Sequence, residues 1–233
     1  MKRSLLFVSL LALFCGQVLA APANDTSTRI QWIQERLNAA AGPARLWQYG
    51  WCGLHGVMAV YYGVDAYNLD APDEKHDRVN AEVSGVSSLL GFGSMLLSPL
   101  TTANDARTLA ALPDTTPAQQ TAKLQQAEML LRRDAEQEQN QRSFQAHLVT
   151  VLVALVSGAI VANDGNRTDD GTVLFAESLL VGEVQIYTAP TDATRAWQAY
   201  QRGELSSAAP LRHNDGGLAV SALPHGIALN YWF

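Results

Sequence analysis

Apolar residues recur at three- and four-residue spacing along most of the chain, a pattern that predicts helices from residue 27 to about residue 203. The first segment places Ile30, Ile33 and Leu37 on one side, and Gly42-Pro43 is expected to end it. Further helices are expected over residues 45–68, 73–98, 172–189 and 191–203. The alternation of Val184, Ile186 and Thr188 also allows a short strand, although the length of that segment favours a helix.

The longest predicted helical stretch covers residues 117–163. Thr116 is suited to cap it, and Pro117 fits the first helical position. Its first half is rich in charged and amide side chains, whereas its second half carries no charge between His147 and Asp164. The stretch is therefore expected to form one long helix, or two helices with a bend near Ser143.

Four segments are apolar on most sides, at residues 46–66, 82–100, 146–163 and 172–189. The uncharged run from Leu148 to Ala162 has 15 residues, short of the ~20 that cross a bilayer comfortably. The links at 67–81 and 164–171 are mainly acidic, so the positive-inside rule gives no support to a four-span topology. Membrane-spanning helices and core helices of a soluble bundle remain alternatives at this stage.

Small residues form a stripe on the third of these segments. Ala154, Gly158 and Ala162 lie four residues apart, so they share one helix face. Such a stripe permits two helices to approach closely in lipid or in water. It predicts helix packing and does not identify the solvent.

The tail alternates apolar and other residues before and after Pro224-His225-Gly226, which predicts a β-hairpin. Its last residues, ending at Phe233, resemble over about nine positions the terminal strand of an outer-membrane β-barrel. The helical periodicity upstream does not fit a barrel. We therefore expect a mainly α protein, a bundle of about five to six helices with a short C-terminal β-hairpin.

The first residues have the features of a secretory signal peptide. Lys2 and Arg3 precede an apolar run, and Ala20 ends a small-residue cleavage site. The expected organisation is a signal peptide at 1–20, a helical bundle domain at 21–203 and a tail with the hairpin at 204–233. The protein is thus expected to be exported, to the periplasm or to an envelope membrane.

Export changes the charge balance and the cysteine content. The mature chain would keep 14 basic and 22 acidic side chains, a formal charge of −8, which makes nucleic acid an unlikely class of partner. Cys52 would be its one cysteine, so no internal disulfide can form. Membrane lipid and self-association through apolar helices are the partners that the pattern favours.

Few residues suggest chemistry. No two of the five histidines have the spacing of a helical metal site, and no catalytic residue, metal or cofactor is predicted. Glu177 and Glu183 interrupt an apolar segment but are six residues apart, which on a helix places them on different faces. His55 is three residues from Cys52, in the spacing of a thiol and its base, but no third group accompanies them. His55, Glu177 and Glu183 are kept as candidate ligand-binding residues.

These observations favour an exported helical protein of the cell envelope, membrane-associated, with a structural or interaction role rather than an enzymatic one. The alternative is a soluble periplasmic helical bundle that binds a small apolar ligand, with aromatic residues such as Trp47, Trp51, Tyr61 and Tyr62 lining a pocket.

Overall fold

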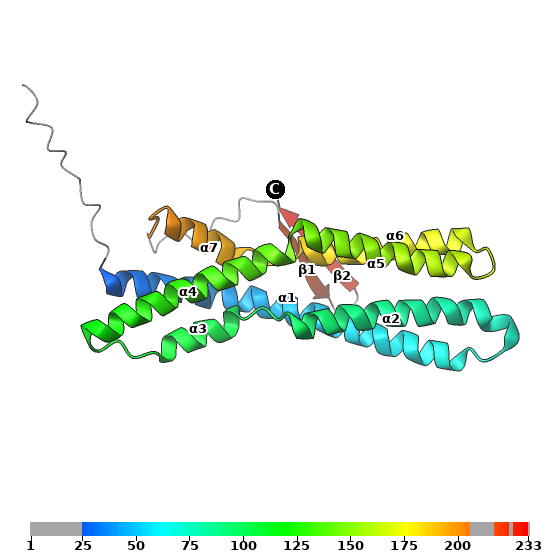
Figure 1. Cartoon of the computed structure of the whole chain (residues 1–233), viewed down its shortest axis with the longest axis horizontal. Coiled ribbons are helices and arrows are strands. Elements are labelled where there is room, and N and C mark those ends of the chain that lie inside the picture. Colours follow the sequence, from blue (N-terminus) through cyan, green and yellow to red (C-terminus); the bar gives the residue numbers. More distant parts are fainter. Residues whose placement is uncertain (1–24, 206–216, 224–225, 233) are drawn as a thin grey trace, which may run out of the picture.

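The computed structural model describes residues 25–205, 217–223 and 226–232, and side chains up to residue 205. The described chain is mainly helical, which confirms the predicted bundle (Figure 1). Its elements are α1 (Thr26–Asn68), the 3₁₀ helix η1 (Pro72–Glu74), α2 (Lys75–Leu97), α3 (Thr102–Ala111), α4 (Pro117–Gln141), α5 (Phe144–Asn163), α6 (Thr168–Tyr187), α7 (Asp192–Gln201), β1 (Gly217–Leu223) and β2 (Gly226–Trp232).

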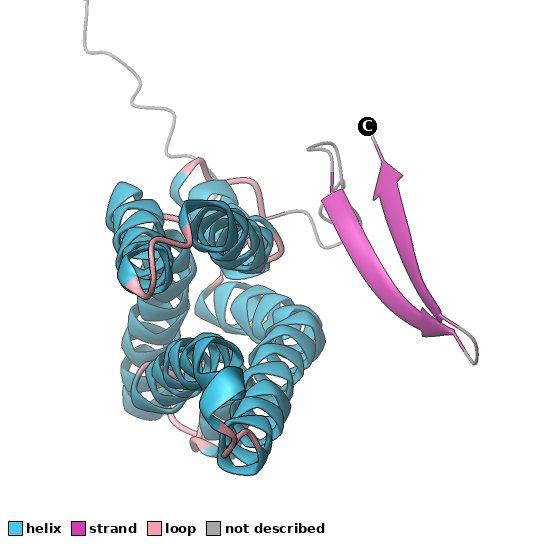
Figure 2. Ribbon diagram, turned by 90° about the vertical axis from the view of Figure 1, so that its right-hand side faces the viewer, coloured by secondary structure: helices cyan, strands magenta, loops and turns pink. Residues whose placement is uncertain are grey.

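The helices form an elongated molecule with two halves that share α1. The first part of α1, to about residue 47, packs with α3, α4 and α7, and we call this half the head. The remainder of α1 pairs with α2 as a first helical hairpin, and α5 pairs with α6 as a second (Figure 2). The loops at 69–74 and 164–167 close these two hairpins at the end farthest from the head, which we call the tip.

The head has an ordinary hydrophobic core. Ile33, Leu37, Leu109 and Leu131 are fully buried in it, and they come from α1, α3 and α4. The amphipathic spacing of each helix turns these residues to one side. Truncating one such leucine to alanine costs about 2–5 kcal/mol, so this core contributes strongly to the stability of the head.

Gly42-Pro43 does not end a helix, contrary to the sequence prediction. The helix continues through Pro43 to Asn68. Pro43 is exposed, whereas Ala41 and Ala44 are buried, and Ala44 packs in a cluster with Met95 and Leu100. This packing stabilises the helix despite the hydrogen bond that proline removes.

Other helix boundaries can be compared with those expected from the sequence. Of the two alternatives left open for residues 117–163, the structure has two helices: α4 ends at Gln141, and the Ser143 hydroxyl caps α5 by accepting from the Ala146 amide at 3.3 Å. The strand considered for Val184–Thr188 is wrong, because α6 continues to Tyr187. The sequence analysis also missed α3, which brings the described α-helices to seven rather than five or six.

The small-residue stripe packs as expected. A Cβ atom at Gly158 would lie 2.6 Å from the carbonyl oxygen of Gly171 and 2.8 Å from the Phe175 Cβ. A Cβ atom at Gly171 would in turn meet the Cβ of Ala162 at 2.6 Å. Since real Cβ atoms do not approach so closely, α5 and α6 are in backbone contact along this stripe.

The described part of the tail consists of β1 and β2, which pair antiparallel with Gly217 opposite Trp232 and Leu223 opposite Gly226. Pro224, His225 and Phe233 lie outside the described residues, as does the predicted signal peptide. How the tail packs on the rest of the protein therefore stays a prediction.

Candidate functional site

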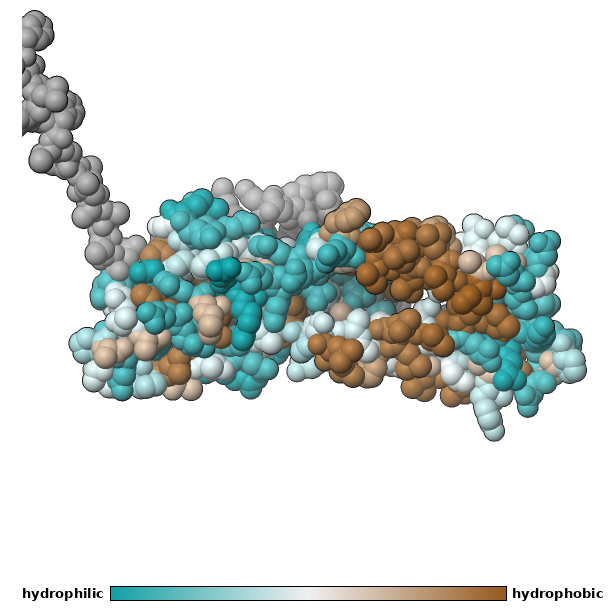
Figure 3. Space-filling view, in the orientation of Figure 1, coloured by the Kyte–Doolittle hydropathy of each residue, from teal (hydrophilic) through white to brown (hydrophobic). Residues whose placement is uncertain are grey.

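The half of the molecule between head and tip exposes an unusual amount of apolar surface. Of the 25 large apolar side chains that are exposed in the described residues, 24 lie on α1 from Leu46 onward and on α2, α5 and α6. Figure 3 shows apolar surface between a polar head and a polar tip. We call the exposed apolar surface of these four helices the belt.

The helices of the belt are less buried than core helices of a soluble bundle usually are. Two stretches, 72–111 and 117–163, are long and apolar enough to cross a membrane by length and composition. Only 11% and 22% of their most apolar windows are buried inside the structure. Core helices of a soluble protein would be mostly buried, and residues 25–205 leave this apolar surface uncovered.

Exposed aromatic residues lie at both edges of the belt, and Tyr61 is exposed between them. On α1, Tyr49 is 71% exposed near the head and Tyr67 is 83% exposed near the tip. The two residues are 18 positions apart, which corresponds to about 27 Å along the helix. Phe144 and Tyr187 are exposed at the head-side ends of α5 and α6. The depth of the belt is thus close to the ~30 Å of a bilayer's hydrocarbon core.

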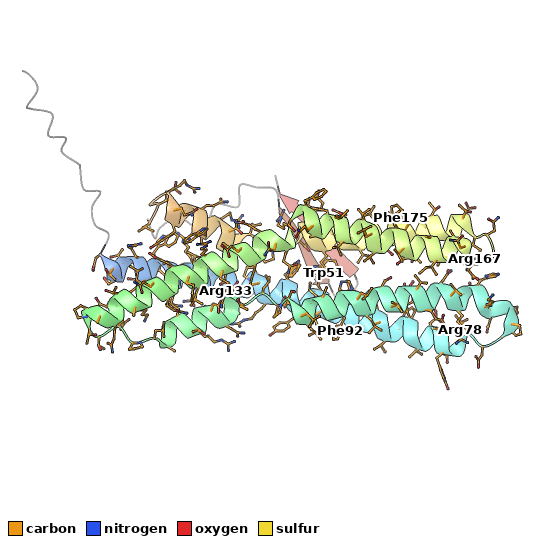
Figure 4. The ribbon with its side chains drawn as sticks, viewed as in Figure 1. Trp51, Arg78, Phe92, Arg133, Arg167 and Phe175 are labelled. Carbon is orange, nitrogen blue, oxygen red and sulfur yellow. The ribbon has the colours of Figure 1, made fainter. Side chains whose placement is uncertain are left out.

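A group of ion pairs joins the two helical hairpins at the tip. Asp164, after α5, accepts from His76 Nδ1 at 2.7 Å and lies 3.7 Å from Arg167 and 3.9 Å from Lys75. Arg167 also donates to the carbonyl oxygen of His76 at 2.8 Å; Figure 4 labels Arg167 and the nearby Arg78. The hydrogen bond from His76 lowers the pKa of the Asp164 carboxyl below its ordinary value.

Midway along the belt, α2 and α5 meet through two hydroxyl groups. Ser87 Oγ lies 2.9 Å from Ser157 Oγ. The groove beside this contact has a volume of about 370 Å³, and its lining is apolar apart from these two serines and Glu82. It opens between the hairpins and includes Val86, Leu152 and Val156.

His55 lies where the first hairpin meets the second at the head side. Its Nε2 is 2.9 Å from Gln185 Oε1 on α6, and its ring occupies space that a Cβ at Gly91 would fill. Trp51, labelled in Figure 4, donates to the Thr188 hydroxyl at 3.0 Å. His55 therefore acts in a contact between α1 and α6, and Cys52 has no hydrogen bond to it.

Glu183 lies in a different contact. Its carboxylate accepts from His147 Nδ1 at 2.9 Å, which links α6 to α5 within the second hairpin. The sequence analysis did not identify His147 as a partner of Glu183. The pairing could have been predicted from the position of His147 near the start of α5, because the start of α5 lies opposite the end of α6 in a helical hairpin.

Glu177 is exposed near the middle of α6 and makes no hydrogen bond or ion pair with a described residue. Trp51 and Thr188 are in contact, and moving 11 residues along each antiparallel helix from that contact leads to Tyr62 and Glu177. Eleven residues turn each helix by about 20° beyond three full turns, and the Glu177 charge interacts with Tyr62, so Glu177 is on the side of α6 toward α1. The structure thus distributes His55, Glu177 and Glu183 over separate positions and does not unite them in one site.

The sequence analysis missed a buried carboxyl pair in the head. Asp134 on α4 is fully buried, and Asp105 on α3 is nearly so. The Thr101 hydroxyl lies 2.9 Å from Asp105 Oδ2 and 3.1 Å from Asp134 Oδ1, while Arg133 donates to Asp105 at 2.5 Å. Burial, together with the neighbouring Asp105, raises the pKa of Asp134 to about 8. The pair therefore shares a proton at neutral pH and joins α3 to α4.

A second buried carboxylate, Glu138, holds α7 in the head. Its two oxygens accept from the backbone amides of Ala193 at 3.1 Å and Thr194 at 2.8 Å. These amides belong to the first turn of α7, where backbone N–H groups lack helical partners. Burial raises the pKa of Glu138, although the two amides act in the opposite direction.

Within residues 25–205 and the two strands, no group of three or more histidine, cysteine, aspartate or glutamate side chains is placed to hold a metal ion. Comparison of the chain with models of known protein families, with curated proteins and with solved structures finds no match.

Proposed function

We propose that this protein is an exported envelope protein whose belt lies in a lipid bilayer, with the head in water and the tip at the opposite membrane surface. The observation that carries the proposal is the concentration of 24 of 25 exposed large apolar side chains on four helix segments between two polar ends. A large apolar side chain gains about 1.5–3 kcal/mol on leaving water, so covering the belt is strongly favourable.

The dimensions of the belt support this proposal. α5 and α6 have 20 residues each, or about 30 Å of helix. Tyr49 and Tyr67 are exposed at its two edges, where aromatic side chains are enriched in membrane proteins. In a four-span arrangement, the head would be on the side to which the N-terminus is exported.

The charges of the tip give no support to this orientation, because the positive-inside rule calls for basic residues there. At the tip, the basic residues form ion pairs with acidic residues, as Lys75 and Arg167 do with Asp164. The proposal therefore rests on the apolar belt and its length rather than on the distribution of charge.

We propose a structural or interaction role rather than an enzymatic one. The polar contacts described above join helices: His55 with Gln185, His147 with Glu183, and Asp134 with Asp105. The C-terminal hairpin is part of this proposal, with its apolar face expected to rest on the helices, on a second copy or on lipid.

A second candidate is a soluble bundle that binds a small apolar ligand. The groove between α2 and α5 favours it, because about 370 Å³ of mainly apolar lining suits an alkyl chain or a small ring system. Native mass spectrometry of the protein purified without detergent tests this candidate. A retained apolar molecule supports it, and a protein that is insoluble without detergent excludes it.

Extraction of the cell envelope with alkaline carbonate tests the main proposal. An embedded protein stays in the membrane pellet, together with a known membrane-spanning marker, whereas a peripheral or soluble protein is released. Recovery of the chain in the supernatant would reject the bilayer location.

A further inference from the structure

Two arginines at the head-side edge of the belt have no carboxylate partner among the described residues. Nine lysine and arginine side chains of the described chain form an ion pair with a carboxylate. Arg45 and Arg142 form none with a described residue. Arg142 donates to the carbonyl oxygen of Ala189 at 3.2 Å, which leaves most of its guanidinium N–H groups free.

Both arginines lie at the same edge of the belt. Arg45 is exposed one helical turn before Tyr49 on α1, and Arg142 is exposed two residues before Phe144 on α5. Tyr49 and Phe144 are among the exposed aromatic residues of that edge. At the other end the cations differ, because Lys75, Arg78 and Arg167 of the tip all pair with carboxylates of this chain.

If the belt lies in lipid as proposed above, its head-side edge is at the depth of the lipid phosphates. Guanidinium groups form paired hydrogen bonds with phosphate oxygens, and a long arginine side chain can reach the headgroup layer from a helix end. We propose that Arg45 and Arg142 form a surface that binds the phosphates of anionic phospholipid headgroups on the head side of the membrane.

This inference rests on the proposed function, and it adds the lipid class and the residues that select it. A basic side chain near an anionic membrane surface contributes about a fivefold gain in binding, since it is worth about 1 kcal/mol. The two arginines together thus give about a 25-fold preference for an anionic over a zwitterionic lipid. The preference falls as salt is added, because exposed charges are screened.

Competition between two lipids measures this preference. The full chain, purified in a neutral detergent, is given equal amounts of phosphatidylglycerol and phosphatidylcholine with the same acyl chains, and bound lipids are identified by native mass spectrometry. We expect the wild type to retain phosphatidylglycerol. The double variant Arg45→Gln, Arg142→Gln should lose about 25-fold in affinity for phosphatidylglycerol and much less for phosphatidylcholine, because the choline ammonium offsets the charge of its phosphate.

Arg107→Gln is the matched control, because Arg107 is also exposed and has no carboxylate partner in the described chain but lies on α3 of the head. It should bind both lipids like the wild type. Equal retention of the two lipids by the wild type would overturn the inference, as would an equal loss in Arg107→Gln. Displacement of the lipid by millimolar inorganic phosphate would also overturn it, since the site would then recognise free phosphate.

The carbonate extraction separates this inference from the proposed function. A chain that resists extraction but shows no lipid preference rejects the arginine surface alone. A chain that carbonate releases rejects the bilayer location and the arginine surface with it.

Discussion

Asp134 and Asp105 face each other in the interior of the head, with the hydroxyl of Thr101 within 3.1 Å of both carboxyl groups. The charged groups that act on Asp134 are Asp105 and Arg133, and burial raises its pKa from 3.8 to about 8. One proton thus belongs to the folded state at neutral pH. Its presence makes the stability of the head depend on pH.

The direction of this dependence follows from proton binding. Below pH 3.8 the folded and unfolded states both hold the proton on residue 134. Between pH 3.8 and about 8 the unfolded chain releases it while the folded head keeps it, so the free energy of unfolding decreases as the pH rises. Above about pH 8 both states are ionised and this contribution no longer changes.

Asp134→Asn should therefore stabilise the head at pH 8 by about 1–3 kcal/mol and have little effect near pH 4, because asparagine needs no proton in order to donate to Asp105. Urea unfolding of the detergent-solubilised chain, followed by near-ultraviolet circular dichroism at both pH values, measures it. Thr108→Ala on the exposed side of α3 is the control, with no change in pH dependence expected. A loss of stability in Asp134→Asn at pH 8 would contradict a shared proton.

Glu138→Ala should destabilise the head by about 1–3 kcal/mol, because the amides of Ala193 and Thr194 would lose their acceptors in a buried position. Glu136→Ala, two residues away, removes an exposed ion pair with Arg132 and should change stability by no more than about 0.5 kcal/mol. The same urea unfolding experiment compares them. Equal effects would mean that Glu138 does not hold α7.

Gly158→Leu should force α5 and α6 apart and cost about 1–3 kcal/mol, because the space beside Gly158 is filled by the backbone of Gly171 and by Phe175. Gly93→Leu is the control, since a Cβ at Gly93 meets no atom within 4 Å. Thermal unfolding in detergent measures both variants. A Gly158→Leu protein as stable as Gly93→Leu would show that the stripe is not a packing surface.

The contact between α2 and α5 can be trapped by a disulfide. With Cys52 replaced by serine, the pair Ser87→Cys and Ser157→Cys should crosslink under mild oxidation, because the two native hydroxyl oxygens are 2.9 Å apart. Ser88→Cys with Ser157→Cys turns one thiol by about 100° on its helix and should crosslink poorly. Protease cleavage between the helices followed by non-reducing electrophoresis reads the result. Efficient crosslinking of the Ser88 pair alone would contradict this register.

The helical content and the cap at Thr116 could be predicted because spacing and capping are local properties, whereas the bend near Ser143 was one of two alternatives that the sequence left open. The continuation of α1 through Pro43 could not, since Ala44 beside it packs in a cluster with Met95 and Leu100, far away in the chain. α3 is a short helix without a long apolar run, and Asp105 on it becomes buried only when it meets α4.

For the candidate site, too, local features could be predicted from the sequence and tertiary contacts could not. The apolar segments were visible in the sequence, but which faces of them are exposed depends on how the hairpins pair. The partners of the polar residues also depend on tertiary contacts: Glu183 meets His147 and His55 meets Gln185, at sequence separations of 36 and 130 residues. No spacing rule relates residues so far apart, so the sequence could name the polar residues and not their contacts.

The location of the belt is tested most directly by comparing two cysteines of equal exposure in the folded chain. Met129, on α4 of the head, and Leu152, in the belt, are each 51% exposed. In a Cys52→Ser background, Met129→Cys and Leu152→Cys are treated in spheroplasts and in detergent-denatured samples with a maleimide that does not cross membranes. The account predicts rapid labelling of residue 129 in spheroplasts and labelling of residue 152 only after denaturation, because lipid covers the belt. Labelling of both cysteines at similar rates in spheroplasts would contradict it.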